Sequence, residues 1–277
     1  PFLDSDGHVI ACLVGQPCNP SYTKSCHHAY KEIMEGCQST ASTEDEQTHH
    51  RGNYPAVHIG VTMPPGGSHP TNLCSGSHGP MVERLLQNGH IKHIASFAEA
   101  AFSLWVEGLY EHYKQHSNAL LAHHQHLHRI FSKSVFSAVM FNFGPQVWTR
   151  KHCDSQNLAF GWCAIQVLGI FDHTKGGHLV LPDLRLVAEF PSGSLILLPS
   201  AMLTHANVPV GDGESRASFT QYSSGGLFHY VDNGFQTDTC LQKEDPDEFK
   251  HICTLKASYW SLGLKLFSKL SNVVEPV

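Results

Sequence analysis

The sequence lacks several features that would place it in a common class of protein. No apolar run reaches the ~18 residues that a membrane-spanning helix needs, and the start does not resemble a secretory signal. Charged residues make up only 15% of the 277 residues, and the formal net charge is -6. Because nucleic-acid-binding domains are usually basic, any contact with phosphates would have to come from a local patch. We therefore expect no membrane association and no globally basic surface.

The cysteines also lack the pattern of a structural framework. There are nine of them, an odd number, and no two form a CxxC pair. Disulfide scaffolds usually carry an even number of cysteines, so we interpret these as reduced thiols of an intracellular protein. A disulfide framework is the alternative. The residues are Cys12, Cys18, Cys26, Cys37, Cys74, Cys153, Cys163, Cys240 and Cys253.

The first half of the chain shows mostly helical patterns. A short apolar run at 8–14 indicates a strand, and the polar stretch 38–53 and the Gly- and Pro-rich stretch 63–79 indicate loops. Apolar residues at helical spacing, or helix boundary residues, predict helices over 22–34, 80–87, 94–115 and 120–131.

After residue 133 the pattern changes to short β-rich runs separated by Gly, Pro or Asp: 135–143, 161–171, 178–181, 184–190, 194–199 and 218–222. Many short strands joined by tight turns favour a jelly roll. We predict one α+β domain with a cupin-like double-stranded β-helix core at 133–235. A layer of helices and strands at 1–132 would pack on it, and a helical extension at 236–277 would carry an apolar stripe of Tyr259, Leu262, Leu264 and Phe267.

A His-x-Asp followed by a distant histidine is the pattern that carries chemistry. His152 and Asp154 are two residues apart, so at a strand end both side chains can point to the same side. His205 follows about fifty residues later, which leaves room for strands that return the chain to the same place. Two histidines and one carboxylate are typical ligands of non-haem Fe(II) oxygenases, and they leave open positions for a 2-oxo acid and O2. Alone, the pattern is weak in a chain with 22 histidines.

An Arg-x-Ser beyond His205 makes the pattern specific. A dicarboxylic acid needs a buried cation at its distal end, and the fork of an arginine suits a carboxylate. Arg216 would supply that cation, and Ser218 would face the same side and donate a second hydrogen bond. Taken singly, Arg216 is better explained as a surface ion pair and His205 as a core histidine. The ordered set in a β-rich region indicates an Fe(II) centre that uses 2-oxoglutarate and O2.

The stretch 152–235 resembles the TET/JBP family of Fe(II)/2-oxoglutarate-dependent dioxygenases, and is most similar to its branch in mushroom-forming fungi. The segments that carry the resemblance are KHCDSQNLAFGWCAI (151–165), FDHTKGGHLVLPDL (171–184), FPSGSLILLPSAMLTHAN (190–207) and ESRASFTQYSSGGLFHYVDNGF (214–235). Weaker likeness extends to 6–17 and 51–67, so that it covers most of the chain.

The resemblance implies roles for individual residues. His152, Asp154 and His205 would bind iron, and Arg216 would bind 2-oxoglutarate. It further implies oxidation of the methyl group of 5-methylcytosine to 5-hydroxymethylcytosine, or beyond. We accordingly expect a nuclear, monomeric protein whose partner is a nucleic acid carrying a methylated base.

A methylated base would have to leave its stack to reach the iron, so the pocket needs an aromatic or imidazole platform and a polar edge. Candidates are Asn157, Phe160, His229 and Tyr230, each of which also has an ordinary structural interpretation. Asn142 could hydrogen-bond the near carboxylate of 2-oxoglutarate. The basic residues nearest the expected mouth are Lys133, Arg150, Lys151 and Lys175, which could contact phosphates.

Two other functions stay open on the sequence. The same chemistry could act on a protein or a small molecule, as in a prolyl-hydroxylase-like enzyme. Alternatively, the chain could be a metal-binding module without turnover, although an intact Arg216 disfavours this because such a module needs no dicarboxylate anchor.

Overall fold

Two antiparallel sheets pack face to face. The computed structural model describes residues 1–39 and 48–274, without the side chains of residues 38, 39, 256 and 257. The larger sheet contains β1 (Phe2–Leu3), β2 (Val9–Gly15), β5 (Ala56–Thr62), β6 (Thr71–Asn72), β7 (Ala138–Asn142), β8 (Cys163–Ile170), β11 (Leu195–Leu198) and β13 (Ser215–Tyr222). The smaller sheet contains β9 (Leu179–Leu181), β10 (Leu186–Ala188) and β12 (Ala206–Asn207), with the 3-10 turn η2 (Pro182–Leu184) between β9 and β10. The strand orders are β1-β2-β11-β8-β13-β7-β5-β6 and β10-β9-β12.

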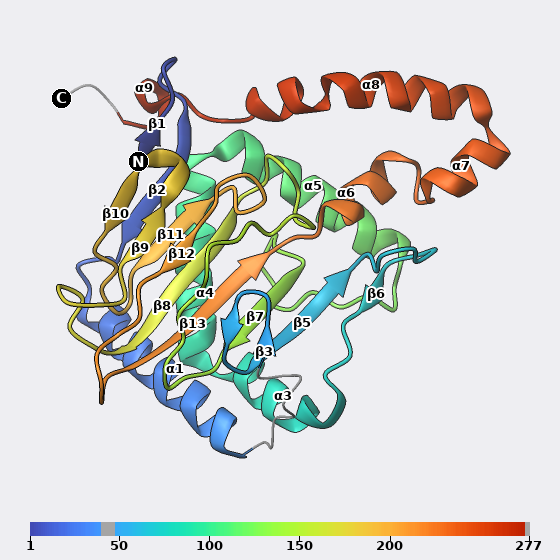
Figure 1. Cartoon of the computed structure of the whole chain (residues 1–277). Helices are drawn as coiled ribbons and strands as arrows, with labels where there is room; N and C mark the ends of the chain where they lie inside the picture. The colour runs from blue at the N-terminus through green and yellow to red at the C-terminus, as the bar shows by residue number, and fades with distance from the viewer. Residues whose placement is uncertain (40–47, 275–277) are drawn as a thin grey trace.

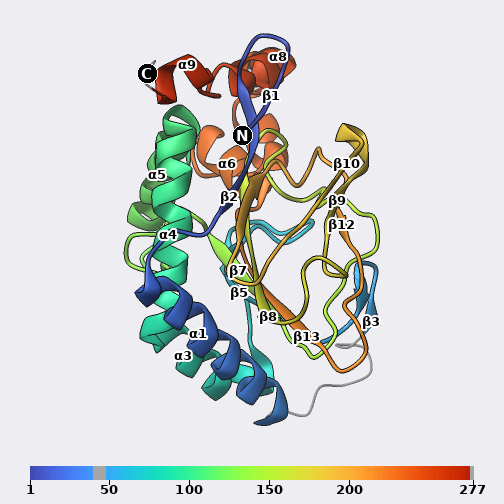
Figure 2. The same cartoon turned by 90° about the vertical axis from the view of Figure 1, so that its left-hand side faces the viewer.

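Helices cover one face of the larger sheet, and the smaller sheet lies on the other (Figure 2). The helical layer consists of α1 (Pro20–Ser39), η1 (Gly76–His78), α3 (Gly79–Gln87), α4 (Gly89–Trp105) and α5 (Glu107–His123). Phe141 of β7 and Phe219 of β13 are buried against this layer, in a cluster with Ile33 of α1 and Ile91 of α4. Because side chains alternate along a strand, the even-numbered residues of β7 and β13 point away from the helices, into the space between the sheets.

Two short pieces border that space. The hairpin of β3 (Thr48–His49) and β4 (Gly52–Asn53) lies in front of β5 and β13 (Figure 1). After β13 the chain forms α6 (Gly225–Asp232), α7 (Asp238–Glu244), α8 (Pro246–Leu264) and α9 (Leu270–Val273). We call residues 238–264 the C-terminal arm, because α7 and α8 extend along one end of the molecule (Figure 1).

The predicted β-rich runs are confirmed as strands. Each of the six contains all or part of one, and together they supply the four central strands of the larger sheet and two strands of the smaller one. The run predicted at 218–222 begins earlier, at Ser215, so that Arg216 lies within β13 and pairs with Gly169 of β8. The structure therefore has the predicted α+β architecture.

Two helix predictions need correction. The helix predicted over 94–115 is divided at Val106, whose φ of -144° and ψ of 68° are not helical. The helix predicted over 120–131 is wrong, because α5 ends at His123. Asn72 supplies the reason: its side-chain amide donates to the carbonyl of His126 and accepts from the amide of His128, at 2.9 and 3.2 Å. These bonds satisfy backbone groups that a helix would otherwise pair.

The predicted C-terminal stripe is only half buried. Phe267 is 8% exposed and Tyr259 packs against the body, but Leu262 and Leu264 are 48% and 38% exposed. The contact is narrow because α8 approaches the body through Gly263, where a methyl group would overlap the ring of Phe160.

All nine cysteines lie within the described ranges and are free thiols, as predicted. Within the same ranges, no helix is both long and apolar enough to cross a membrane.

Candidate metal centre

His152 and His205 are brought together by backbone pairing. They face each other across an isolated antiparallel bridge, in which each backbone amide donates to the other residue's carbonyl, at 3.2 and 3.0 Å. Their ring centroids are 4.2 Å apart. The amide of Asp154 donates to the carbonyl of Ser200 at 2.8 Å, which fixes the carboxylate beside the two rings. Backbone bonds, rather than flexible side-chain contacts, therefore position the cluster.

The three side chains point their ligand atoms at one another. The Nε2 atom of His152 lies 3.8 Å from Oδ1 of Asp154, and that of His205 lies 3.9 Å from Oδ2. All the candidate ligand atoms lie within 4.8 Å of one another, as ligands of one ion would. Two imidazoles and one carboxylate form a donor set that suits Fe(II). The sequence-predicted ligand residues thus converge.

Each imidazole is oriented by a nearby backbone carbonyl. Nδ1 of His152 lies 2.8 Å from the carbonyl oxygen of Arg150, and Nδ1 of His205 lies 2.9 Å from that of Leu203. A ring that donates from Nδ1 keeps the lone pair of Nε2 for a metal. Burial, together with the adjacent His205 ring, lowers the pKa of His152 to about 4. The His152 imidazole is therefore neutral at physiological pH, as a ligand must be.

Arg216 has the properties of a carboxylate anchor. Its side chain is 1% exposed, and Nη1 donates to the carbonyl of Val147 at 2.7 Å. Nε and Nη2 are buried and have no hydrogen-bond partner among the described residues. Burial lowers the pKa of Arg216 to about 10, so the group is still charged near pH 7. Because a buried charge with unpaired donors is costly, this arrangement fits a bound carboxylate.

Ser218 and Asn142 extend the polar surface beside Arg216. Ser218 lies two residues along β13 on the same face, and its Oγ accepts a hydrogen bond of 2.8 Å from Nδ2 of Asn142. Among the described residues, neither the buried Oδ1 of Asn142 nor the buried hydroxyl of Tyr54 has a hydrogen-bond partner. Burial raises the pKa of Tyr54 to about 12, while the charges of Arg51 and Arg216 act to lower it and that of Asp154 to raise it. Tyr54 is thus within electrostatic reach of both the metal ligands and the anchor.

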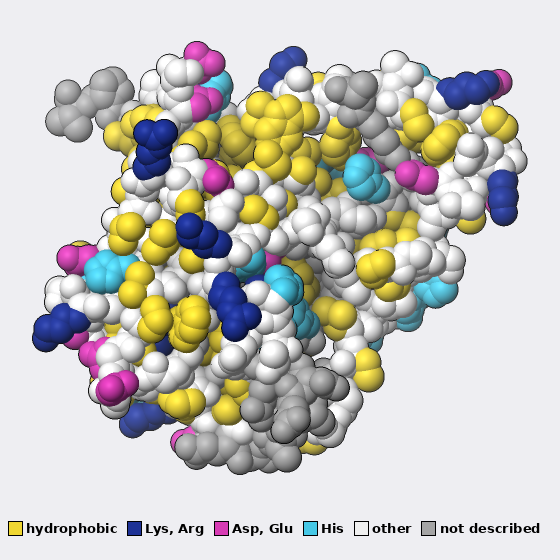
Figure 3. Space-filling model, in the orientation of Figure 1, with side chains coloured by type: hydrophobic (Ala, Val, Ile, Leu, Met, Phe, Trp, Pro, Cys, Tyr) yellow, Lys and Arg dark blue, Asp and Glu magenta, His cyan; other side chains and the backbone are white. Residues whose placement is uncertain are grey.

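A cavity of about 320 Å³ opens beside Asp154. The face of the molecule is hollowed at this place (Figure 3). The wall of this cavity contains a connected chain of polar side chains. Nη1 of Arg51 lies 3.6 Å from Oδ1 of Asp154, and Nη2 of Arg51 lies 3.2 Å from Nε2 of His58. Nδ1 of His58 lies 2.8 Å from the hydroxyl of Tyr222. The chain links the metal ligand to an aromatic ring on the last core strand.

These wall residues were missed by the sequence analysis. Tyr222 could have been found, since it continues the even-numbered face of β13 that carries Arg216 and Ser218. Arg51 and His58 gave no signal, because Arg51 lies in the β3–β4 hairpin and approaches Asp154 only in the folded chain.

The predicted substrate residues separate into two groups. Asn157 lines the cavity, and its Nδ2 donates to Oγ of Ser200 at 3.0 Å. Phe160 is 3% exposed and packs against Tyr259, away from the cavity wall. His229 and Tyr230 lie on α6 and line neighbouring clefts, and the Tyr230 hydroxyl lies 3.0 Å from Nε2 of His124. Contact of Phe160, His229 or Tyr230 with a substrate stays a prediction.

The four basic residues that were predicted near the mouth lie in different parts of the structure. Arg150 and Lys151 are exposed and directly precede His152. Lys175 forms an ion pair of 2.8 Å with Asp172, and Lys133 lines a groove along α4. Only the first two lie next to the metal cluster in the chain.

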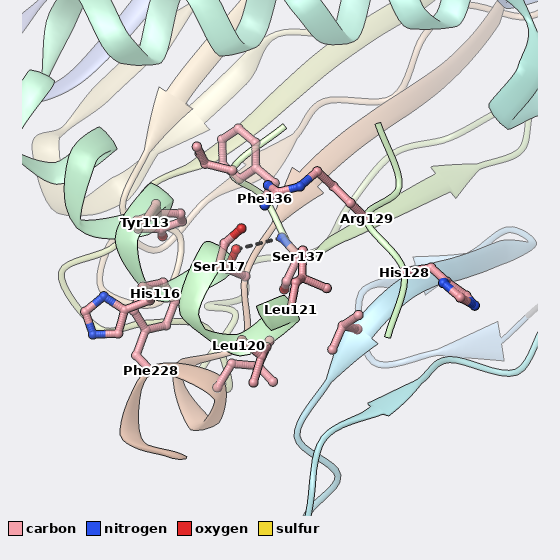
Figure 4. A pocket seen from close by; sticks show the side chains of 14 residues that line it. Tyr113, His116, Ser117, Leu120, Leu121, His128, Arg129, Phe136, Ser137 and Phe228 are labelled. Atoms are coloured by element: carbon pink, nitrogen blue, oxygen red, sulfur yellow. Dashed lines mark hydrogen bonds between the residues drawn. The ribbon is translucent and has the colours of Figure 1, made fainter. Parts of the chain in front are cut away.

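A different, mostly apolar pocket lies between α5, α6 and the start of β7 (Figure 4). It has a volume of about 30 Å³, room for roughly one water molecule. Its lining includes Tyr113, Leu120, Phe136 and Phe228, with His116 and Arg129, but no carboxylate among the residues described. It lacks the ligand set of the cavity beside Asp154.

Comparison with solved structures identifies the fold. The chain is similar to NgTET1 in complex with 5mC DNA, with a TM-score of 0.53, 13% identity and coverage of 81% of this chain and 75% of that one. A Pseudomonas putida prolyl-4-hydroxylase gives a TM-score of 0.37 at 13% identity, covering 80% of this chain and 95% of that one. A viral collagen prolyl hydroxylase from Paramecium Bursaria Chlorella virus-1 gives 0.25 at 20% identity, covering 31% and 57%.

No protein-family model and no curated protein matches the sequence. The TET/JBP resemblance therefore stays a prediction beyond the level of fold. At that level the result is plain: the chain has the double-stranded β-helix fold of the Fe(II)/2-oxoglutarate oxygenases.

Proposed function

We propose that this chain is an Fe(II)- and 2-oxoglutarate-dependent dioxygenase that oxidises the methyl group of 5-methylcytosine in nucleic acid. One observation carries the enzyme class: His152, Asp154 and His205 converge. Tyr54, which interacts electrostatically with Asp154, also interacts with the buried Arg216, two of whose donors have no partner among the described residues. A metal-binding module without turnover would have no use for that second feature, which is costly when unpaired.

One set of residues would bind the metal ion and a second set would bind the co-substrate. His152, Asp154 and His205 would hold Fe(II), and Arg216, Ser218 and Tyr54 would bind the distal carboxylate of 2-oxoglutarate. Bound iron, with O2 and 2-oxoglutarate, supplies the oxidising power that hydroxylates a C–H bond and yields succinate and CO2.

The cavity beside Asp154 favours a flat, polar-edged substrate. The ring of Tyr222 is held by the bond between its hydroxyl and His58, and the amide side chain of Asn157 also lines the cavity. A base that has left its stack is recognised by such an aromatic face together with polar groups at its edge. Arg51 adds a positive charge beside the carboxylate of Asp154. The structural likeness to NgTET1 in complex with 5mC DNA supports the same substrate class.

The direct test is mass spectrometry of methylated oligonucleotides incubated with the protein, Fe(II), ascorbate and 2-oxoglutarate. We expect 5-hydroxymethylcytosine and a matching amount of succinate. Tyr222→Phe, which keeps the ring, should retain product formation, whereas Tyr222→Ala should lose it. Succinate formed on a peptide or small molecule while every oligonucleotide is unchanged would refute the substrate. Absence of succinate with all substrates would refute the enzyme class.

A further inference from the structure

The cavity beside Asp154 does not stand alone. A second cleft of about 420 Å³ shares Ser155, Gln156 and Asn157 with it, so this loop forms the wall between the two. From the loop the second cleft extends to α6 and to Tyr259 and Trp260 of α8. A third, wider groove, lined by the 63–68 loop and by residues 236–240, also includes Gln156. Gln156 lines all three hollows, which therefore adjoin one another around it, and we call the three together the cleft.

The C-terminal arm presents an aromatic surface to this cleft. The Tyr259 hydroxyl donates to Asp232, and its ring stacks on His229 with centroids 5.7 Å apart and planes at 29°. Asp232 is in turn held by Nε2 of His116 at 2.8 Å. Tyr259 therefore anchors α8, while Trp260, the next residue, is 42% exposed at the cleft. A ring on an anchored helix loses little conformational freedom when it binds a ligand.

The charges of the cleft are unevenly distributed. Arg51 lines the cavity beside Asp154, and the exposed Arg150 and Lys151 directly precede His152. In contrast, neither the second cleft nor the wide groove has a lysine or arginine among its described lining residues. Recognition of phosphates needs cations, whereas stacking of bases on aromatic rings does not. A strand that crosses the metal site would thus meet positive charge on one side and aromatic rings on the other.

We propose that Trp260 is a specificity-determining residue that stacks the nucleobase next to the methylated cytosine, on one side of it only. Because a base inside a duplex is already stacked, the strand must be single on that side. The inference rests on the proposed function and adds to it the strandedness of the substrate and the direction in which it lies across the site.

The test uses short single-stranded DNA with one 5-methylcytosine, in which the neighbouring base on the 5′ or the 3′ side is replaced by an abasic unit. For the unaltered protein, one of these two replacements should raise KM on the order of tenfold, with kcat unchanged. Trp260→Ala should raise KM for the intact strand by the same factor, and the sensitive abasic replacement should then add no further loss. Trp260→Phe should restore most of the affinity.

The matched control is Leu262→Ala. Leu262 is 48% exposed on the same helix and lines none of the cavities described above, so this variant should behave like the unaltered protein. Two results would overturn this inference alone. One is that the increases in KM caused by Trp260→Ala and by the abasic unit multiply when the two changes are combined. The other is that Trp260→Ala leaves KM unchanged. An unaltered protein that oxidises none of the strands would overturn it together with the proposed function.

Discussion

The metal end of the cleft and the C-terminal arm are built in different ways. At the metal end, strand pairing and backbone bonds position the side chains, and His205, Arg216 and Ser218 are all at most 4% exposed. In the arm, α8 instead contacts the body at Tyr259 and through a close approach at Gly263, while Leu255, Trp260 and Leu262 are more than 40% exposed. We infer from this comparison that the two regions have different roles. The rigid strands position the groups that take part in the chemistry, whereas α8 contributes to the choice of substrate and can change without disturbing those strands.

The largest effect should come from the metal end. Asp154→Ala removes the only carboxylate of the ligand cluster and should abolish Fe(II)-dependent turnover of 2-oxoglutarate, measured as succinate. Circular dichroism should show a folded protein, since the backbone bonds of this residue do not depend on its side chain. Normal succinate formation by the variant would exclude the ligand assignment.

The anchor should give the next largest effect. Arg216→Ala removes charge-assisted hydrogen bonds to the co-substrate and should raise KM for 2-oxoglutarate roughly 10- to 150-fold. Arg216→Lys keeps the charge but not the fork, so it should recover only part of the loss. A KM that is unchanged in both variants would assign the anchor to another residue.

A smaller effect should follow from loosening the arm. Gly263→Ala places a methyl group against the ring of Phe160, and such overpacking costs about 1–3 kcal/mol. We expect weaker binding of single-stranded DNA but unchanged KM for 2-oxoglutarate, because Tyr259 and Gly263 of α8 contact Phe160 and His229 rather than the metal ligands. If KM for both rose together, the two regions would not be independent.

The smallest effect concerns pH. Burial alone would lower the pKa of His116, but its bonds to Asp232 and to the carbonyl of His112 outweigh burial and raise it. Burial would raise the pKa of Asp232, but its bonds to His116 and Tyr259 lower it instead. The neighbouring His112 stays neutral, because burial lowers its pKa to about 4.

The contact should therefore stabilise the arm most between about pH 4 and 6.5. The His116 contribution is complete below its ordinary pKa and is lost as pH rises through the raised one. The Asp232 contribution is lost as pH falls through the lowered one. We expect amide hydrogen exchange in α8, corrected for the intrinsic rate, to be faster at about pH 8 than at about pH 6. Asp232→Asn should remove that difference and lower Tm by roughly 2–4 °C. Equal protection of α8 at both pH values in the unaltered protein would contradict this account.

The sequence predicted the groups positioned by strands better than the contacts made between distant segments. Strand alternation placed Arg216 and Ser218 on one face, and the orienting carbonyls of the two ligand histidines lie only two residues before each ring. These relations are local. Arg51 contacts Asp154 from a hairpin about a hundred residues away, and no local pattern encodes such a contact. Phe160 lies close to the His-x-Asp in sequence, yet packing against Tyr259 turns it away from the cavity.

The most direct test of the central claim is an anaerobic calorimetric titration of 2-oxoglutarate into the protein with and without Fe(II). We expect tight binding only with Fe(II) present, loss of that binding in Asp154→Ala and marked weakening in Arg216→Ala. Binding of 2-oxoglutarate that is indifferent to Fe(II) and to Asp154 would contradict a single site formed by the metal ligands and Arg216.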